Sequence, residues 1–138
     1  MYLVLDSSVI IASLVEKEEK HAKCRQLLQR VKDGEFTVLE PYTVLVEVVA
    51  AIRRRTGSES LAERIGEDLQ RIGNVYFLEL LSQRAAKAAT VAKSTGLRGM
   101  DAILVQIAQE FDAILISLDE EILKKAGRVV KIRHIDGF

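Results

Sequence analysis

The feature of this 138-residue sequence that most constrains its fold is an alternation of short apolar runs with helix-like segments. Apolar runs typical of buried strands occupy residues 2–5, 36–39, 75–81, 113–117 and 129–132. Helical periodicity or helix-favouring composition marks residues 6–15, 17–34, 42–57, 60–73, 82–96, 98–111 and 119–127. Because the strands are apolar on both faces and alternate with helices, the pattern predicts a parallel sheet covered on both sides, an α/β/α sandwich. We expect residues 1–138 to form one domain.

The composition excludes several classes of protein. Twenty basic residues balance 20 acidic ones, so no strongly basic field is available to attract nucleic acid. The single cysteine, Cys24, excludes an internal disulfide and fits a reducing compartment. The start lacks a basic leader, and no apolar stretch approaches the roughly 20 residues of a spanning helix, so we expect a cytoplasmic protein without a membrane partner. The slightly positive mean hydropathy suggests apolar surface that a partner covers.

Three aspartates fall where the carboxyl edge of the sheet is predicted. Asp6 ends the first strand, Asp119 lies two residues beyond the fourth, and Asp101 opens the helix that leads into the fourth. Sites in such folds form outside the carboxyl ends of the strands. Each aspartate also stands at a helix start, where an acid caps free N–H groups. From the sequence alone, capping therefore stays open as the explanation for each of them.

Glu47 is harder to explain as a structural residue. It lies about five residues into its helix, where it cannot act as a cap, and no Lys or Arg occupies the neighbouring helical positions. One side of this helix, formed by Leu45, Val48, Val49 and Ile52, is expected to face the core. The less bulky stripe that carries Glu47 comprises Thr43, Ala50, Ala51 and Arg54. The spacing predicts that Glu47 projects into a cleft, although a solvated glutamate on an exposed stripe stays open as the alternative.

Four clustered carboxylates would repel one another and raise one another's pKa values. Divalent cations relieve this repulsion, and hard oxygen ligands suit Mg²⁺ or Mn²⁺. Four negative charges balance up to two such ions, and two-metal carboxylate sites commonly cleave phosphodiesters. The acids therefore point to a metal-dependent hydrolase.

Four segments together resemble the PIN-domain family, in particular its VapC-type toxin ribonucleases. They are "LVLDSSVIIA" around Asp6, "VEVVAAIRR" around Glu47, "LRGMDAILVQIAQ" around Asp101 and "ILISLDEEI" around Asp119. Each motif alone is weakly specific, but their order, spacing and the chain length together are quite specific. The resemblance covers essentially the whole chain and implies a single PIN domain with a parallel sheet of about five strands.

The resemblance also implies a function. It implies that Asp6, Glu47, Asp101 and Asp119 bind Mg²⁺ or Mn²⁺, as one or two ions, and that Ser117 and Ser8 orient carboxylates or water. Ser8 stands where the family often has Asn. The implied activity is endoribonuclease cleavage of RNA by the toxin of a toxin–antitoxin pair, with a cognate antitoxin as partner and a homodimer as assembly.

Alternatives and secondary candidates remain. A non-catalytic PIN-like module that binds RNA or protein is the main rival to an enzyme. A receiver or an Asp-x-Asp phosphatase fits less well, because Ser7 and Ser8 follow Asp6 where those proteins need further acids. Arg54 and Arg98 are candidate contacts to RNA phosphates, and helix capping competes with that role for Arg54. Glu120 and Glu121 either belong to the metal site or only complement the helix dipole.

Overall fold

A computed structural model describes all residues, 1–138, and contains a five-stranded parallel sheet in the order β3-β2-β1-β4-β5. The strands are β1 (Tyr2–Leu5), β2 (Thr37–Pro41), β3 (Val75–Leu78), β4 (Ile114–Ser117) and β5 (Lys131–His134). The chain runs outward from β1 to β3, then crosses back to form β4 on the other side of β1. The direction of strand order therefore reverses between β1 and β4, which is where α/β folds place their sites.

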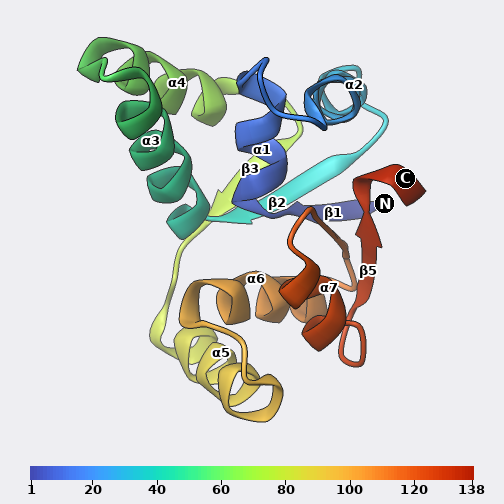
Figure 1. The fold of residues 1–138 in the computed structure, drawn as a ribbon. Helices are drawn as coiled ribbons and strands as arrows, with labels where there is room; N and C mark the ends of the chain where they lie inside the picture. The colour runs from blue at the N-terminus through green and yellow to red at the C-terminus, as the bar shows by residue number, and fades with distance from the viewer.

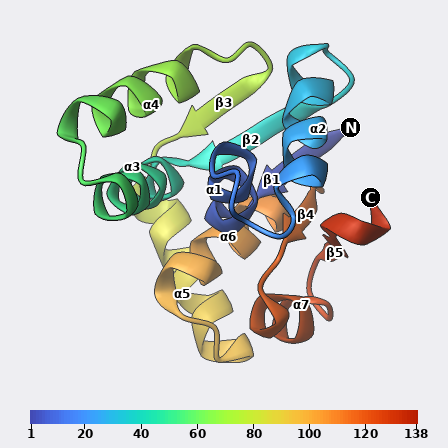
Figure 2. The same cartoon turned by 45° about the horizontal axis from the view of Figure 1, so that its top comes forward.

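Helices cover both faces of this sheet (Figure 1). They are α1 (Ser7–Leu14), α2 (His21–Lys32), α3 (Tyr42–Thr56), α4 (Glu59–Arg71), α5 (Ser82–Thr95), α6 (Gly99–Glu110) and α7 (Glu120–Ala126), followed by the 3-10 turn η1 (Ile135–Gly137). Helices α1 to α4 lie on one side, where α1 sits between α2 and α3 (Figure 2), and α5 to α7 lie on the other. The reversal of strand order requires this change of face, because crossovers are right-handed. The predicted three-layer sandwich is confirmed.

The core explains why the strands are apolar throughout. The first strand contributes Leu3, Val4 and Leu5, which are at most 1% exposed. Parallel pairing aligns Leu5 with Ile116 of β4, and the Asp6 N–H donates to the Ile116 carbonyl at 2.9 Å. This register sets Asp6 beside Ser117 at the reversal point.

Several expected boundaries shift. Helix α2 begins at His21 rather than residue 17, and β3 ends at Leu78 rather than residue 81. The helix expected from residue 60 begins at Glu59, and Ser58 caps it, with its hydroxyl accepting from the Leu61 N–H at 3.1 Å. The last strand lies two residues later than expected, and η1 follows it. None of the helices combines the length and apolar character that crossing a membrane requires.

Candidate metal-binding acid cleft

The four acids singled out by the sequence line one cleft at the carboxyl edge of the sheet. They come from the end of β1 (Asp6), the middle of α3 (Glu47), the first turn of α6 (Asp101) and the residue before α7 (Asp119). The cleft has a volume of about 350 Å³. Its other lining residues are Ser7, Ser8, Ile11, Glu18, Arg55, Arg98 and Leu118. Segments distant in sequence thus bring their carboxylates around one space.

Asp6 is held at the base of the cleft by two hydroxyl groups. It is 5% exposed, and its Oδ2 accepts hydrogen bonds from Ser8 Oγ at 2.6 Å and from Ser117 Oγ at 2.9 Å. Although Asp6 immediately precedes α1, its side chain accepts no N–H from the first turn, so capping does not explain it. Because both hydroxyls engage Oδ2, the Oδ1 atom is left for other partners.

The same serines tie Asp6 to the segment that carries Asp119. The Leu118 N–H donates to Ser8 Oγ at 3.3 Å, and the Asp119 N–H donates to Ser117 Oγ at 2.9 Å. Ser117 is fully buried, so its hydroxyl has a fixed environment. These bonds set the relative positions of two of the four acids.

Glu47 is positioned by the packing of α3. The buried residues of this helix are Val44, Val48, Ala51 and Ile52, whereas Leu45 and Val49 are only partly buried. The expected core face was thus rotated slightly from the real one. Val49 meets α4 at Gly66, where a Cβ atom would lie 3.0 Å from Val49 Cγ2, so the glycine permits the close helix contact. Gly57 then ends α3 in the left-handed conformation, at φ +69°.

The charge environment of Glu47 is unfavourable. Its side chain is half-buried and makes no ion pair or hydrogen bond with the protein. Burial raises the pKa of Glu47, the negative charges of Asp6 and Asp101 raise it further, and Arg98 opposes the rise. The structure therefore places Glu47 in the cleft rather than on a solvated stripe.

Asp101 and Asp119 share a cation. Arg98 Nε lies 3.5 Å from Asp101 Oδ2, and Arg98 Nη2 lies 3.6 Å from Asp119 Oδ2. Burial and the charge of Asp6 raise the pKa of Asp101, and the charge of Arg98 opposes this. Asp101 accepts no backbone hydrogen bond, so capping does not explain it. Asp119 does cap α7 through Oδ1, which accepts the N–H of Glu121 at 2.8 Å, while its Oδ2 faces Arg98.

The secondary candidates separate in the structure. Of the two candidate phosphate contacts, Arg98 lines the cleft and Arg54 does not. The neighbouring Arg55 lines the cleft instead, paired with Glu18 from the loop after α1. Arg55 therefore reaches the cleft, whereas Arg54, the residue that the sequence favoured, is one position away from it on the helix.

The two glutamates after Asp119 do not line the cleft. Glu120 is exposed at the start of α7. Glu121 is also exposed and pairs with Lys125 one turn later, at 2.6 Å. Both therefore suit the role of first-turn acids that favour the helix dipole.

Sequence reasoning missed a fifth acid, Glu40. It lies on β2 with 0% exposure, its Oε1 accepts the Leu5 N–H at 2.6 Å, and its Oε2 has no partner. Burial raises the pKa of Glu40 well above its ordinary value, which favours the neutral acid. Since Leu5 directly precedes Asp6, Glu40 braces the end of β1. The sequence does mark Glu40, because it is the one acid inside the otherwise largely apolar run "FTVLEP".

The carboxylate oxygens of the cleft are the type of ligand that suits Mg²⁺ or Mn²⁺. The four acids do not, however, converge on a single point that an ion could occupy. Carboxylate oxygens are the preferred ligands of these ions. The mutual repulsion that raises the pKa values of Glu47 and Asp101 is the kind that a divalent cation relieves. As the side chains lie, however, no three His, Cys, Asp or Glu residues form a group that could hold a metal ion. Shared coordination of one ion therefore requires the carboxylates to move.

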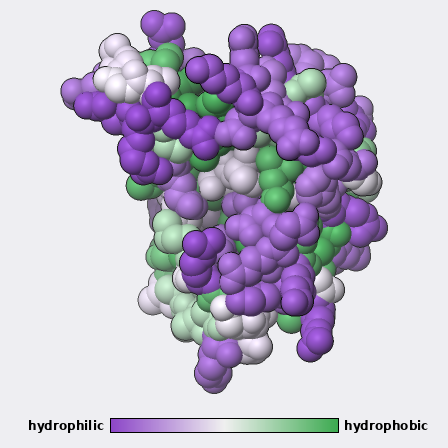
Figure 3. Space-filling view, in the orientation of Figure 1, coloured by the Kyte–Doolittle hydropathy of each residue, from purple (hydrophilic) through white to green (hydrophobic).

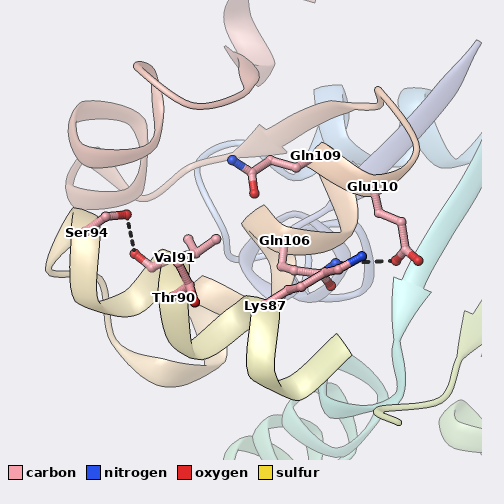
Figure 4. Close-up of a pocket in the computed structure, with 7 residues that line it drawn as sticks. All are labelled: Lys87, Thr90, Val91, Ser94, Gln106, Gln109 and Glu110. Carbon is pink, nitrogen blue, oxygen red and sulfur yellow. Dashed lines mark hydrogen bonds between the residues drawn. The ribbon is translucent and has the colours of Figure 1, made fainter. Parts of the chain in front are cut away.

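A second cavity, of about 400 Å³, lies between α5 and α6 and contains none of the four acids (Figure 4). Its lining residues are Lys87, Thr90, Val91, Ser94, Gln106, Gln109 and Glu110. Gln106 is 2% exposed, and its Nε2 donates to Glu110 Oε2 at 3.4 Å while its Oε1 is unpaired. One small donor would satisfy that oxygen, so the cavity indicates no particular chemistry. The cleft remains the candidate site.

Comparisons with known proteins bear on the fold and on the family of the chain. A search of curated proteins found no match. Among solved structures, the chain resembles the VapC20 toxin of Mycobacterium tuberculosis, described as cleaving the sarcin-ricin loop, with 15% identity, a TM-score of 0.76 and coverage of 95% of this chain and 98% of that one. It also resembles a DNA-bound VapBC from Salmonella typhimurium, with 11% identity, a TM-score of 0.74 and 98% coverage of both chains. A toxin–antitoxin complex from Klebsiella pneumoniae gives 13% identity, a TM-score of 0.67 and coverage of 96% and 97%.

These similarities support the fold, and a match to a family profile shows which family the chain belongs to. The profile of the PIN domain matches residues 3–128, which include the four cleft acids. The match spans all of the sheet except its last strand, together with all seven α-helices. The chain belongs to the PIN domain family.

Proposed function

We propose that the protein is a metal-dependent endoribonuclease that hydrolyses RNA phosphodiester bonds, with Asp6, Glu47, Asp101 and Asp119 as ligands for one or two Mg²⁺ or Mn²⁺ ions. The observation that carries the proposal is the gathering of these acids in one cleft at the reversal point of the sheet. Membership of the PIN family and the similarity to a toxin described as cleaving the sarcin-ricin loop support it.

Each side chain has a distinct part in this proposal. Ser8 and Ser117 hold Asp6 so that one of its oxygens faces the cleft. Bound divalent ions would supply charge stabilisation for the phosphodiester as it is cleaved. Arg55 and Arg98 provide positive charge at the rim, where a phosphate of the RNA backbone would lie. No histidine lines the cleft, so general-base catalysis by an imidazole is not part of the proposal.

The biological setting proposed is a cytoplasmic toxin–antitoxin pair, in which a cognate antitoxin blocks this cleft. Two of the solved structures described above, the VapBC from Salmonella typhimurium and the complex from Klebsiella pneumoniae, are toxin–antitoxin complexes, which supports this setting. We also propose a homodimer. Its support is an apolar groove between α5 and α6, lined by Leu80, Met100 and Ile103 together with alanines, in the region where hydrophobic residues gather over α5 (Figure 3). Light scattering in solution would measure the dimer directly.

Cleavage of a mixed RNA pool in Mn²⁺ or Mg²⁺ tests the proposed activity. The wild-type chain is expected to cut with either ion and to lose activity in excess chelator. The rival, a non-catalytic module, predicts binding of RNA or protein with no cleavage in any metal. The pool includes ribosomal and transfer RNA, so that a nuclease restricted to few RNAs still meets its substrate, and cut ends are mapped by sequencing.

A further inference from the structure

The guanidinium group of Arg98 lies between two carboxylates that the proposed function assigns to metal ions. It reaches Asp101 and Asp119 at 3.5 and 3.6 Å. We propose that Arg98 is a resident counter-ion of the metal-free cleft, which must move away when a divalent ion binds and which thereby sets the metal affinity of the site. The inference rests on the proposed function, and it adds a positioning residue to that site.

The geometry makes a metal ion and Arg98 competitors. Oxygen ligands lie about 2.1 Å from a bound Mg²⁺ ion. Here the Oδ2 atoms of Asp101 and Asp119 instead face nitrogens at more than 3.4 Å, and no three acids converge as they lie. A guanidinium is broader than a metal ion, so two carboxylates that face one guanidinium are spaced more widely than two that share a metal ion. Its positive charge also repels a divalent cation at the same place.

The ion pairs of Arg98 are weak enough to break when a metal ion binds. Both distances exceed the roughly 2.7–2.9 Å of a strong charge-assisted hydrogen bond. The Arg98 side chain is 73% exposed, whereas that of Asp101 is 14% exposed. Arg98 also borders the apolar groove lined by Leu80, Met100 and Ile103, so its alkyl stem has a surface to lie on outside the cleft.

No other cation duplicates this contact. Arg55 lines the cleft but pairs with Glu18, which is not a candidate ligand. Lys125 of α7 does not line the cleft, and it pairs with Glu121. The charge of Arg98 also opposes the rise in the pKa values of both Glu47 and Asp101, so its influence extends across the cleft.

Calorimetric titration of the full chain with Mn²⁺ alone, without RNA, tests the inference. Arg98→Gln is expected to bind Mn²⁺ about three- to tenfold more tightly than wild type, since removing weak exposed ion pairs changes affinity by this order. Arg98→Lys keeps the charge and is expected to fall between the two. Arg55→Gln is the matched control, because it removes a cleft cation that contacts no candidate ligand, and its affinity should change by less than about twofold.

Thermal melting supplies a second measurement. Without metal, Arg98→Gln is expected to melt below wild type, because Asp101 and Asp119 lose their shared cation. With saturating Mn²⁺, its gain in melting temperature should exceed that of wild type. A merely structural role for Arg98 would lower the melting temperature in both conditions without tightening the binding.

Three results would overturn the inference. Unchanged or weaker Mn²⁺ binding by Arg98→Gln would show that Arg98 does not compete with the metal. Equal tightening in Arg98→Gln and Arg55→Gln would show a general effect of net charge. Absence of Mn²⁺ binding by wild type and all variants would overturn the proposed function as well, so the two failures are distinguishable.

Discussion

Asp136 in η1 and Asp101 in the cleft are both aspartates near an edge of the fold, but they have opposite surroundings. Asp136 accepts from Lys23 Nζ at 2.7 Å and from Lys20 Nζ at 2.9 Å, and these bonds lower its pKa to about 2. Asp101 is enclosed with other acids, and burial raises its pKa. The contrast shows that the chain pairs an exposed acid with two lysines yet leaves its enclosed acids short of positive charge. A cation from solution is the natural complement of the second arrangement.

The largest expected difference between the two regions is in catalysis. Glu47→Gln and Asp101→Asn should each lower Mn²⁺-dependent RNA cleavage by about 10²-fold or more, because each removes the charge of a proposed metal ligand and keeps the shape of the side chain. Asp136→Asn serves as the control and should cleave like wild type. Initial rates under single-turnover conditions measure the effect. Wild-type activity in Glu47→Gln would remove that residue from the site.

A smaller effect is expected for Ser117, whose hydroxyl group holds the proposed ligand Asp6. Ser117→Ala removes the bonds to Asp6 and to the Asp119 N–H. It should weaken Mn²⁺ binding by about 10- to 100-fold, which is typical for the loss of a group that orients a ligand. Ser13→Ala, which loses only a bond to the Ile10 carbonyl on α1, should leave Mn²⁺ binding unchanged. Equal affinities for the two variants would mean that Ser117 has no positioning role.

The stability of the metal-free protein at pH 7 should change in opposite directions in the two regions. Asp101→Asn removes a charge from an acidic cleft and is expected to raise the melting temperature by about 1–4 °C. Asp136→Asn removes two exposed ion pairs and should lower it slightly, since solvent and salt screen such pairs. Scanning calorimetry in chelator compares them. A fall in melting temperature for Asp101→Asn would show that its carboxylate is already well compensated.

The smallest predicted difference is in the pH dependence of these shifts. The raised pKa of Asp101 means that the folded protein binds its proton more tightly than the unfolded chain, so stability is lost as pH rises above about 4. The stabilising effect of Asp101→Asn should therefore vanish as pH falls to about 4.

The lowered pKa of Asp136 has the opposite sign. Its contribution is present above about 4 and is lost as pH falls toward about 2. Asp136→Asn and wild type should thus differ at pH 5 and converge near pH 2. A melting-temperature difference that stays constant down to pH 2 would contradict the role of the lysine pair.

Much of the fold was predictable because its rules are local. Apolar runs bounded by helix signals predicted all five strands, and the right-handed crossover rule predicted the covered parallel sheet. Errors occurred where tertiary contacts decide the outcome. Residues 17–20 continue the amphipathic pattern of α2, yet the loop there places Glu18 against Arg55 instead. The burial of Val44 in place of Leu45 likewise depends on how α3 lies against its neighbours.

The sequence predicted which acids line the cleft, but it did not predict the contacts between the residues there. Glu47 stood out because no basic neighbour could pair with it along the helix, and the structure places it in the cleft with the three aspartates. No sequence pattern distinguishes Arg54 from Arg55 at the cleft, because a rotation of one helical position decides between them. Arg98 was expected to meet RNA, whereas its present partners are two acids. Asp101 lies three positions further along the chain, and Asp119 lies near Arg98 only in the folded chain.

Anomalous diffraction from crystals soaked in Mn²⁺ tests the central claim most directly, namely that the four acids form a metal site. We predict one or two peaks within the cleft, within ligating distance of carboxylate oxygens from Asp6, Glu47, Asp101 and Asp119. Saturating Mn²⁺ that leaves the cleft without a peak, while the acids keep their present positions, would contradict the account.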